Sequence, residues 1–248
     1  MPKIDERGFM QLPGLITLRP DQEDLIKEAA DMVGESFMEE PWFQTWVEIL
    51  DELGVSEDRK REIVQASFWG DFIEHSKYQG VYITEDLAAC AGAYLFSDLK
   101  GHDHQKLEDR GDLEALEHLL TPEETRLLDR RADDMDAISN FSWALDAAGG
   151  KDHIYVYGWA VDTNKRGSGA LRRMVEPFFQ YADEHQLNMY LDCFSDNLQS
   201  LYEHLGFELI DVLSDPNFEI TERRMVRKPN VKRLKEYEDQ PANLAKTK

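Results

Sequence analysis

The chain is poor in cysteine, in basic residues and in long apolar runs. Its 2 cysteines, Cys90 and Cys193, are too few for a disulfide framework or a metal-binding spacing. Lys and Arg number 28 against 50 Asp and Glu, and the net charge of −22 argues against nucleic acid as a partner. No apolar run could cross a bilayer, and the first residues do not resemble a secretory signal. We therefore expect a cytoplasmic protein with no metal ion, no nucleic acid and no membrane as partners.

The composition favours a single folded domain. Hydrophobic residues make up 42% of the chain, which is enough for a substantial core, and no linker divides it. We expect one domain over residues 1–230 and a charged C-terminal tail over residues 231–248. Residues 99–150 form a charged segment that we expect to be a helical insertion. Within it, Thr121-Pro122-Glu123-Glu124 predicts a helix start, with Thr as the cap, Pro first and Glu third.

A strand, a glycine loop and a helix are predicted after the insertion. An apolar run from His153 to Val161 precedes Arg166-Gly167-Ser168-Gly169-Ala170-Leu171, where an amphipathic segment begins. Glycine lets a ligand approach the backbone, and the first amides and the dipole of a helix favour an anion. The loop lacks the spacings of the Walker and dinucleotide-binding loops. It indicates either a diphosphate site or an ordinary turn between strand and helix.

Together with a second motif, this loop resembles the GCN5-related N-acetyltransferase (GNAT) superfamily. That family has Arg/Gln-x-x-Gly-x-Gly/Ala at the start of a helix, and Asn-x-x-x-x-Tyr-x-x-x-Gly-Phe across the next helix and strand. Here the first motif lies at residues 166–171 and the second runs from Asn197 through Tyr202 to Gly206-Phe207.

The resemblance implies a mixed fold of the α/β (α+β) class. Its twisted, mostly antiparallel sheet would be flanked by helices, with the helical insertion placed before the central core strand. Two positions depart from the family pattern: Thr163 stands where proline is usual, and Leu171 stands where a second small residue is usual.

The resemblance further implies acetyl-CoA as the cosubstrate, bound without a metal ion. The loop amides would hold its diphosphate, the strand before the loop would bind the pantetheine arm and polarise the thioester, and Asn197 would bond to the arm. Tyr202 would donate a proton to the leaving thiolate, a role that a neutral phenol suits. Alternatively, Tyr202 packs against the sheet, and Asn197 caps a helix together with Ser195 and Asp196. The expected cofactor-binding residues are Trp159, Ala160, Val161, Arg166, Gly167, Ser168, Gly169, Ala170, Leu171, Asn197 and Tyr202.

The residue that accepts the proton of the attacking amine is less evident. In the resembled family it often projects from positions that match Tyr155 and Tyr157. Alternation along the strand places His153, Tyr155, Tyr157 and Trp159 on one face. Because neutral tyrosines are poor bases, Tyr155 and Tyr157 would line the acceptor pocket or relay a proton through water. His153 has a suitable pKa, or it simply lies exposed where the strand begins.

We expect an N-acetyltransferase that acts directly, in a ternary complex, on a primary amine of a small molecule such as an antibiotic or a polyamine. The negative charge of the chain suits a cationic substrate. Two alternatives remain open. One is acetylation of a protein at a lysine or an N-terminus, and the other is a sensor that binds acyl-CoA without catalysis. A homodimer is also left open.

Overall fold

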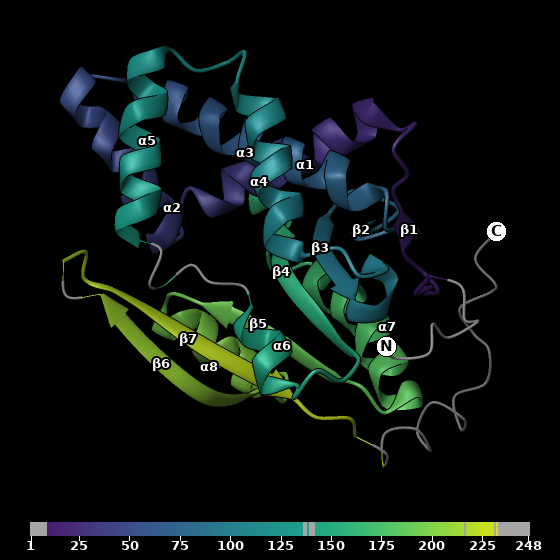
Figure 1. Cartoon of the computed structure of the whole chain (residues 1–248). Helices are drawn as coiled ribbons and strands as arrows, with labels where there is room; N and C mark the ends of the chain where they lie inside the picture. Colours follow the sequence, from purple (N-terminus) through teal and green to yellow (C-terminus); the bar gives the residue numbers. More distant parts are fainter. Residues whose placement is uncertain (1–8, 136–137, 139–141, 216, 231, 233–248) are drawn as a thin grey trace.

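A computed structural model describes residues 9–135, 138, 142–215, 217–230 and 232, so the predicted C-terminal tail lies outside the described residues except for Lys232. The described strands form one seven-stranded sheet in the order β1-β2-β3-β4-β5-β7-β6 (Figure 1). They are β1 (Ile16–Thr17), β2 (Val81–Ile83), β3 (Ala89–Leu95), β4 (His153–Val161), β5 (Asn188–Cys193), β6 (Glu208–Asp215) and β7 (Ile220–Arg227).

Neighbouring strands of the described sheet are antiparallel, except that β4 and β5 run parallel. The α-helices are α1 (Glu23–Phe37), α2 (Pro41–Glu48), α3 (Glu57–Ser76), α4 (His104–Leu116), α5 (Pro122–Met135), α6 (Trp143–Ala147), α7 (Ala170–His185) and α8 (Asp196–His204). Short 3-10 helices are η1 (Ile49–Leu53), η2 (Phe96–Leu99) and η4 (Thr163–Lys165). The predicted mixed, mostly antiparallel fold is confirmed, and α4, α5 and α6 make up the predicted helical insertion before β4.

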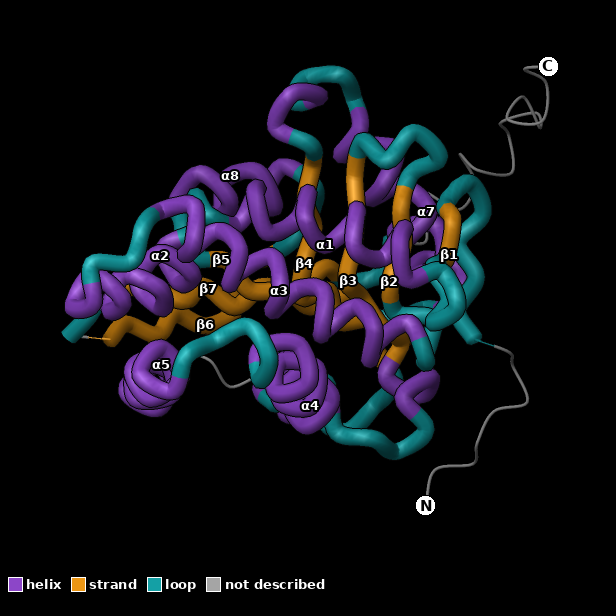
Figure 2. Tube along the Cα trace, turned by 90° about the horizontal axis from the view of Figure 1, so that it is seen from above, coloured by secondary structure: helices purple, strands orange, loops and turns teal. Residues whose placement is uncertain are grey.

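Helices cover both faces of the sheet and bury two apolar layers. Phe178 and Phe179 of α7 pack on one face with Trp159, whereas Ile26 of α1 and Ile63 of α3 pack on the other. Burying an apolar side chain of this size contributes about 1.5–3 kcal/mol, so these two layers supply the main stabilisation. The insertion packs on the helices of the second layer and adds Leu116 and Leu127 to it: α4 is beside α3, and α5 is beside α2 (Figures 1 and 2).

The cysteines are buried and unpaired. Cys90 and Cys193 are both free thiols. Burial raises the pKa of the Cys193 thiol to about 12, so it stays protonated and unreactive at neutral pH. Separately, none of the described helices combines the length and the apolar composition that a membrane span needs.

Candidate active site

Strands β4 and β5 diverge at the centre of the sheet. Their parallel pairing joins His153–Tyr155 to Asn188–Tyr190 and extends no further along the described strands. Beyond it, residues 156–161 of β4 keep β3 as a partner on one edge but do not pair with β5 on the other. A cavity of about 1710 Å³ is lined by the ends of both strands. Such a free strand edge can bind an extended ligand through its backbone groups.

Helix α7 begins at this cavity, and its first amides are not paired within the helix. Gly169, the residue before the helix, has a φ of 82°, and no side chain of the described residues caps this end. The first backbone bond back to Gly169 comes from the amide of Arg173, at 3.1 Å. Gly167, Ala170 and Leu171 also line the cavity. Since the free amides and the positive end of the helix dipole point the same way, this end of α7 suits an anion.

Arg166 and Ser168 are placed differently from the residues around them. Arg166 lines the cavity, but its Nη1 lies 2.9 Å from Oε2 of Glu39, so its charge is paired and ties the loop to the end of α1. The amide of Ser168 donates to the carbonyl of Lys165 at 3.2 Å. The side chain of Arg166 and the backbone amide of Ser168 therefore hold the loop in place, in addition to anything they offer a ligand.

A β-bulge in β4 changes which residues face the cavity. Gly92 and Ala93 of β3 pair with Gly158 and Val156 of β4, so Tyr157 is an extra residue. A shift of one residue moves every following side chain to the opposite face of the sheet.

The prediction that four side chains share one face is therefore wrong for Trp159. Tyr155 packs with His104 of α4, at a ring distance of 5.6 Å, while Trp159 packs with Phe178 of α7 at 5.9 Å. Alternation along the strand was the wrong rule here because the extra residue, Tyr157, interrupts it. Of the other residues predicted on this strand, Val161 lines the cavity and Ala160 is buried beneath it.

Two polar atoms beside the bulge are buried without a hydrogen-bond partner among the described residues. They are the hydroxyl of Tyr157 and Nε1 of Trp159, and both side chains line the cavity. Leaving a buried polar group unbonded costs about 1–3 kcal/mol. A ligand that supplies an acceptor to either atom would therefore be stabilised.

Asn197 and Tyr202 reach the cavity from α8. Ser195 caps this helix, because its Oγ accepts a bond from the amide of Leu198 at 3.3 Å. The alternative role of Asn197 as the cap is therefore taken by Ser195. Tyr202 is 7% exposed and its ring lies 6.1 Å from that of Trp159. Burial raises the pKa of Tyr202 above its usual range, so its phenol stays protonated.

His153 and Tyr155 are both buried, on the face that carries α4 and α6. His153 is 1% exposed, its Nδ1 lies 2.8 Å from the carbonyl of Lys151, and it is not among the described residues that line the cavity. Burial lowers its pKa. The hydroxyl of Tyr155 donates to Oδ1 of Asp192 at 2.5 Å, and burial raises the pKa of this phenol well above its usual range. Tyr155 thus joins β4 to β5 just beyond the end of their pairing.

Sequence reasoning missed the carboxyl groups that line the cavity. Burial raises the pKa of Glu40, just before α2, to about 7, and the nearby Glu39 and Asp192 add to the shift. Burial also raises the pKa of Glu222 in β7 to about 7, even though Arg224 lies 2.8 Å away and opposes the change. A further carboxyl, Glu108, comes from α4 of the insertion. Groups with such pKa values can exchange protons near neutral pH.

The insertion closes the cavity on its outer side. Aromatic side chains from α2 and α3, Trp42, Phe43 and Phe68, face aliphatic ones from α4 and α5, Leu116 and Leu128. These aromatic residues thus belong both to the core and to the cavity wall. The part of the cavity between α2, α3, α4 and α5 therefore offers an apolar surface.

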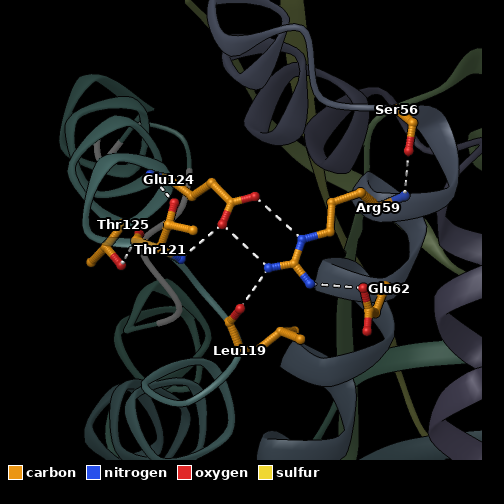
Figure 3. Close-up of polar contacts among 7 residues, drawn as sticks. All are labelled: Ser56, Arg59, Glu62, Leu119, Thr121, Glu124 and Thr125. Carbon is orange, nitrogen blue, oxygen red and sulfur yellow. Dashed lines mark hydrogen bonds and ion pairs between the residues drawn. The ribbon is translucent and has the colours of Figure 1, made fainter.

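A partly buried ion pair holds α5 in this position (Figure 3). Nε and Nη2 of Arg59 in α3 each lie 3.2 Å from a carboxyl oxygen of Glu124, and Nη2 also donates to the carbonyl of Leu119 at 2.5 Å. Glu124 accepts a bond from the amide of Thr121 at 2.8 Å, and its own amide donates to Thr121 Oγ1 at 3.3 Å. The predicted helix start at Thr121 is confirmed, and its glutamate also binds the neighbouring helix.

Known proteins share both the sequence and the fold. Residues 43–207 match the sequence profile of the Acetyltransferase (GNAT) family. An uncharacterized N-acetyltransferase of Schizosaccharomyces pombe is 30% identical over 124 residues, 49% of this chain and 46% of that protein, so the match spans less than half of that relative.

Solved structures agree in fold. A structure described as histone acetyltransferase HPA2 and related acetyltransferase, from Corynebacterium glutamicum, has a TM-score of 0.54 at 16% identity, covering 89% of this chain and 98% of its own. Arylalkylamine N-acetyltransferase 2 from Aedes aegypti has a TM-score of 0.51 at 17% identity, covering 87% and 98%. At these identities the likeness concerns the fold alone.

Proposed function

The chain belongs to the acetyltransferase (GNAT) family, and on this premise we propose that it transfers an acetyl group from acetyl-CoA to a primary amine of a small molecule. The transfer is direct, within a ternary complex of the protein and both substrates. Acetylation of a protein at a lysine or an N-terminus is the alternative reaction, and an acyl-CoA sensor is the alternative without catalysis.

The uncapped start of α7 is the observation that carries this proposal. Gly167 and Gly169 have φ values of 80° and 82°, a conformation that favours glycine, and within the described part of the chain no side chain caps the helix. We assign the CoA diphosphate to the amides of residues 166–171, with the dipole of α7 adding to their attraction. Arg172, whose Nε lies 3.5 Å from Glu176, brings a further positive charge to this end.

The free edge of β4 suits the pantetheine arm. The amide groups of the arm would form hydrogen bonds with the backbone at Trp159, Ala160 and Val161, as an added strand would. One backbone N–H at these positions would polarise the thioester carbonyl. Asn197, which lines the cavity from α8, would bond to the arm as well. The two diverging strands leave space for this arm between them.

The chemical step needs a proton donor for the leaving sulfur. The amine nitrogen forms a bond to the thioester carbon, and the carbon–sulfur bond then breaks to release a thiolate. Tyr202 lines the cavity, and its buried phenol is protonated at neutral pH, so it would donate the proton that the thiolate takes up. The second proton of the amine nitrogen would restore the phenol.

The walls of the cavity favour a small amine over a peptide. Helices α4 and α5 cover its outer side, and Trp42 and Leu128 belong to the apolar lining. Glu40, Asp192 and Glu222 give the part near β4 and β5 an acidic lining that attracts an ammonium group. An amine with an apolar body would use both parts.

The proposal is tested by measuring CoA release from acetyl-CoA with spermidine, phenylethylamine, an aminoglycoside and a lysine peptide. The same assays are made with Tyr202→Phe, which keeps the ring and removes the hydroxyl. We expect turnover on a small amine, and a fall in kcat of about 100-fold in the variant with acetyl-CoA affinity retained.

Other outcomes separate the alternatives. Turnover on the lysine peptide alone supports the protein acetyltransferase. Tight binding of acetyl-CoA without turnover on any amine supports the sensor. A chain that does not bind acetyl-CoA contradicts all three.

A further inference from the structure

Three buried titratable side chains form a row of close polar contacts behind the cavity. Nε2 of His75, in α3, lies 3.0 Å from Nδ1 of His104, and Nε2 of His104 lies 2.9 Å from Oε1 of Glu108 in the same helix α4. At the far end, Nδ1 of His75 lies 2.8 Å from the backbone carbonyl of Asp71. His75 is 0% exposed and the other two side chains are 7% exposed, so water hardly competes for these bonds.

Counting protons along the row fixes their positions. A carbonyl only accepts, so Nδ1 of His75 carries a hydrogen and its Nε2 is an acceptor. Nδ1 of His104 then donates to His75, which leaves Nε2 of His104 as an acceptor toward Glu108. With both rings neutral, the 2.9 Å contact between Nε2 of His104 and Oε1 of Glu108 would bring two acceptors together unless Glu108 is a carboxylic acid that carries the proton.

Burial favours this neutral arrangement at each of the three groups. It raises the pKa of Glu108 to about 8, and it lowers that of His75 to about 4 and that of His104 to about 3. The titratable groups that face Glu108 are Asp71 and His75 of α3, Tyr94 of β3, Tyr155 and Tyr157 of β4, Asp192 of β5, and His104 and Asp109 of α4. The carboxylates of Asp109 and Asp192 add to the rise in the pKa of Glu108, while His75 opposes it.

The row ends at the cavity, next to the bulge of β4. Glu108 lines the cavity together with Tyr157. The ring of Tyr157 lies 4.8 Å from that of His75 and 5.2 Å from that of His104. The insertion thus places a carboxyl group, with a row of imidazoles behind it, against the strand that we assign to the thioester.

We propose that Glu108 is the general base of the acetyl transfer and that His104 and His75 are the residues that position it. This inference rests on the proposed function. Because the Asp71 carbonyl fixes the row, an ionised Glu108 faces the acceptor nitrogen of His104 and gains no hydrogen bond from it. The carboxylate therefore binds a proton strongly.

The proton balance follows directly. The carboxylate of Glu108 takes one proton from the substrate ammonium, which becomes a neutral amine and attacks the thioester carbon. Glu108 is then a carboxylic acid, which relieves the close approach of two acceptors at Nε2 of His104. After the products leave, Glu108 releases this proton to the solvent.

The decisive experiment is the pH dependence of kcat/KM for Glu108→Gln, with the amine of the panel that turns over fastest. Near pH 7 we expect a loss of about 100-fold, because most of the amine is protonated and has no base. Toward about pH 10 the loss should shrink to roughly tenfold or less, because free amine needs no base. His104→Asn should show the same trend with a smaller loss.

Glu114→Gln, an exposed change on the same helix, is the matched control and should follow the native profile. Calorimetric binding of CoA to each variant shows that it is folded. If the native protein is active, the inference is overturned when Glu108→Gln loses kcat/KM equally at every pH or loses none. Stoichiometric zinc in the purified protein, removed by a chelator together with activity, also overturns it, since the donor atoms lie within 4.8 Å of one another. A native protein inactive on every amine overturns the proposed function, and the inference with it.

Discussion

Gly70 of α3 and Gly111 of α4 lie backbone against backbone where the two helices cross. A Cβ atom added at Gly111 would lie 2.6 Å from the carbonyl carbon and oxygen of Gly70. Glycine at both positions thus lets the insertion helix approach α3 closely. The same approach brings His104 within hydrogen-bond distance of His75.

Gly111→Ala should therefore destabilise the protein. Within a helix this change normally stabilises by up to about 1 kcal/mol, but here the new methyl group pushes the helices apart. We expect the free energy of unfolding in urea to fall by about 1–3 kcal/mol. Glu114→Ala, exposed on the same helix, should change it by about 0.5 kcal/mol or less. A stabilised Gly111→Ala variant would show that α3 and α4 are less closely packed than described.

Gly169→Ala should weaken acetyl-CoA binding. The residue has a φ of 82°, so a Cβ strains the start of α7 and stands beside the amides that we assign to the diphosphate. We expect the Kd of acetyl-CoA, measured by calorimetry, to rise about tenfold or more, which is about 1.4 kcal/mol. Gly14→Ala is the matched control, because Gly14 has a φ of 89°, open surroundings and no place in the cavity lining. Equal affinities in the two variants would contradict the assignment.

Arg59→Ala should disturb the apolar part of the cavity between α2 and α5, where we place the amine. It should leave the part at the start of α7, where we place acetyl-CoA, intact. The change leaves the buried carboxyl of Glu124 without its ion pair, so we expect a loss of about 1–2 kcal/mol in the free energy of unfolding. The KM for the amine should rise as α5 loosens, whereas the KM for acetyl-CoA should not. Arg126→Ala removes an exposed pair with Glu123 on the same helix and should leave both constants unchanged. Equal rises in the two KM values would mean that α5 does not act on the amine site alone.

The buried carboxyl of Glu108 predicts a loss of stability as the pH rises. Its pKa is about 8 in the folded chain against 4.5 as the ordinary value, so between these values the folded chain holds a proton that the unfolded chain has released. Raising the pH then favours unfolding, by up to about 1.4 kcal/mol per pH unit for one such group.

We therefore expect the free energy of unfolding to fall more steeply with rising pH in the native protein than in Glu108→Gln, between about pH 6.5 and pH 8. Urea titrations at several pH values measure this. Unfolded histidines are still partly protonated near pH 6.5, so the depressed pKa values of His75 and His104 add a contribution of opposite sign there, and it is present in both proteins. Glu40 and Glu222 are present in both proteins, so their contributions cancel. Identical slopes would mean that the folded Glu108 is already ionised.

Local signals in the sequence predicted the glycine loop, the insertion and the helix start at Thr121. Gly167 and Gly169 adopt positive φ values, and Thr121 and Glu124 exchange the bonds of a capping box. These features succeed because each depends on residues that lie within a few positions of one another.

The bulge and the row of imidazoles depend on partners distant in the sequence. Nothing in the run from His153 to Val161 marks Tyr157 as an extra residue, because the shift arises from pairing with β3. His75 and Glu108 lie in charged helical segments that read as solvated surfaces until α4 packs on α3. Isolated glycines inside two helices, Gly70 and Gly111, were the available signal for that contact.

Binding of CoA, dephospho-CoA and pantetheine to the native protein, measured by calorimetry, tests most directly whether the start of α7 holds the diphosphate. The first two ligands carry the diphosphate and the third lacks it. We expect CoA and dephospho-CoA to bind within about tenfold of each other, and pantetheine to bind at least about 100-fold more weakly. Pantetheine binding as tightly as CoA, or no binding of CoA at all, would contradict it.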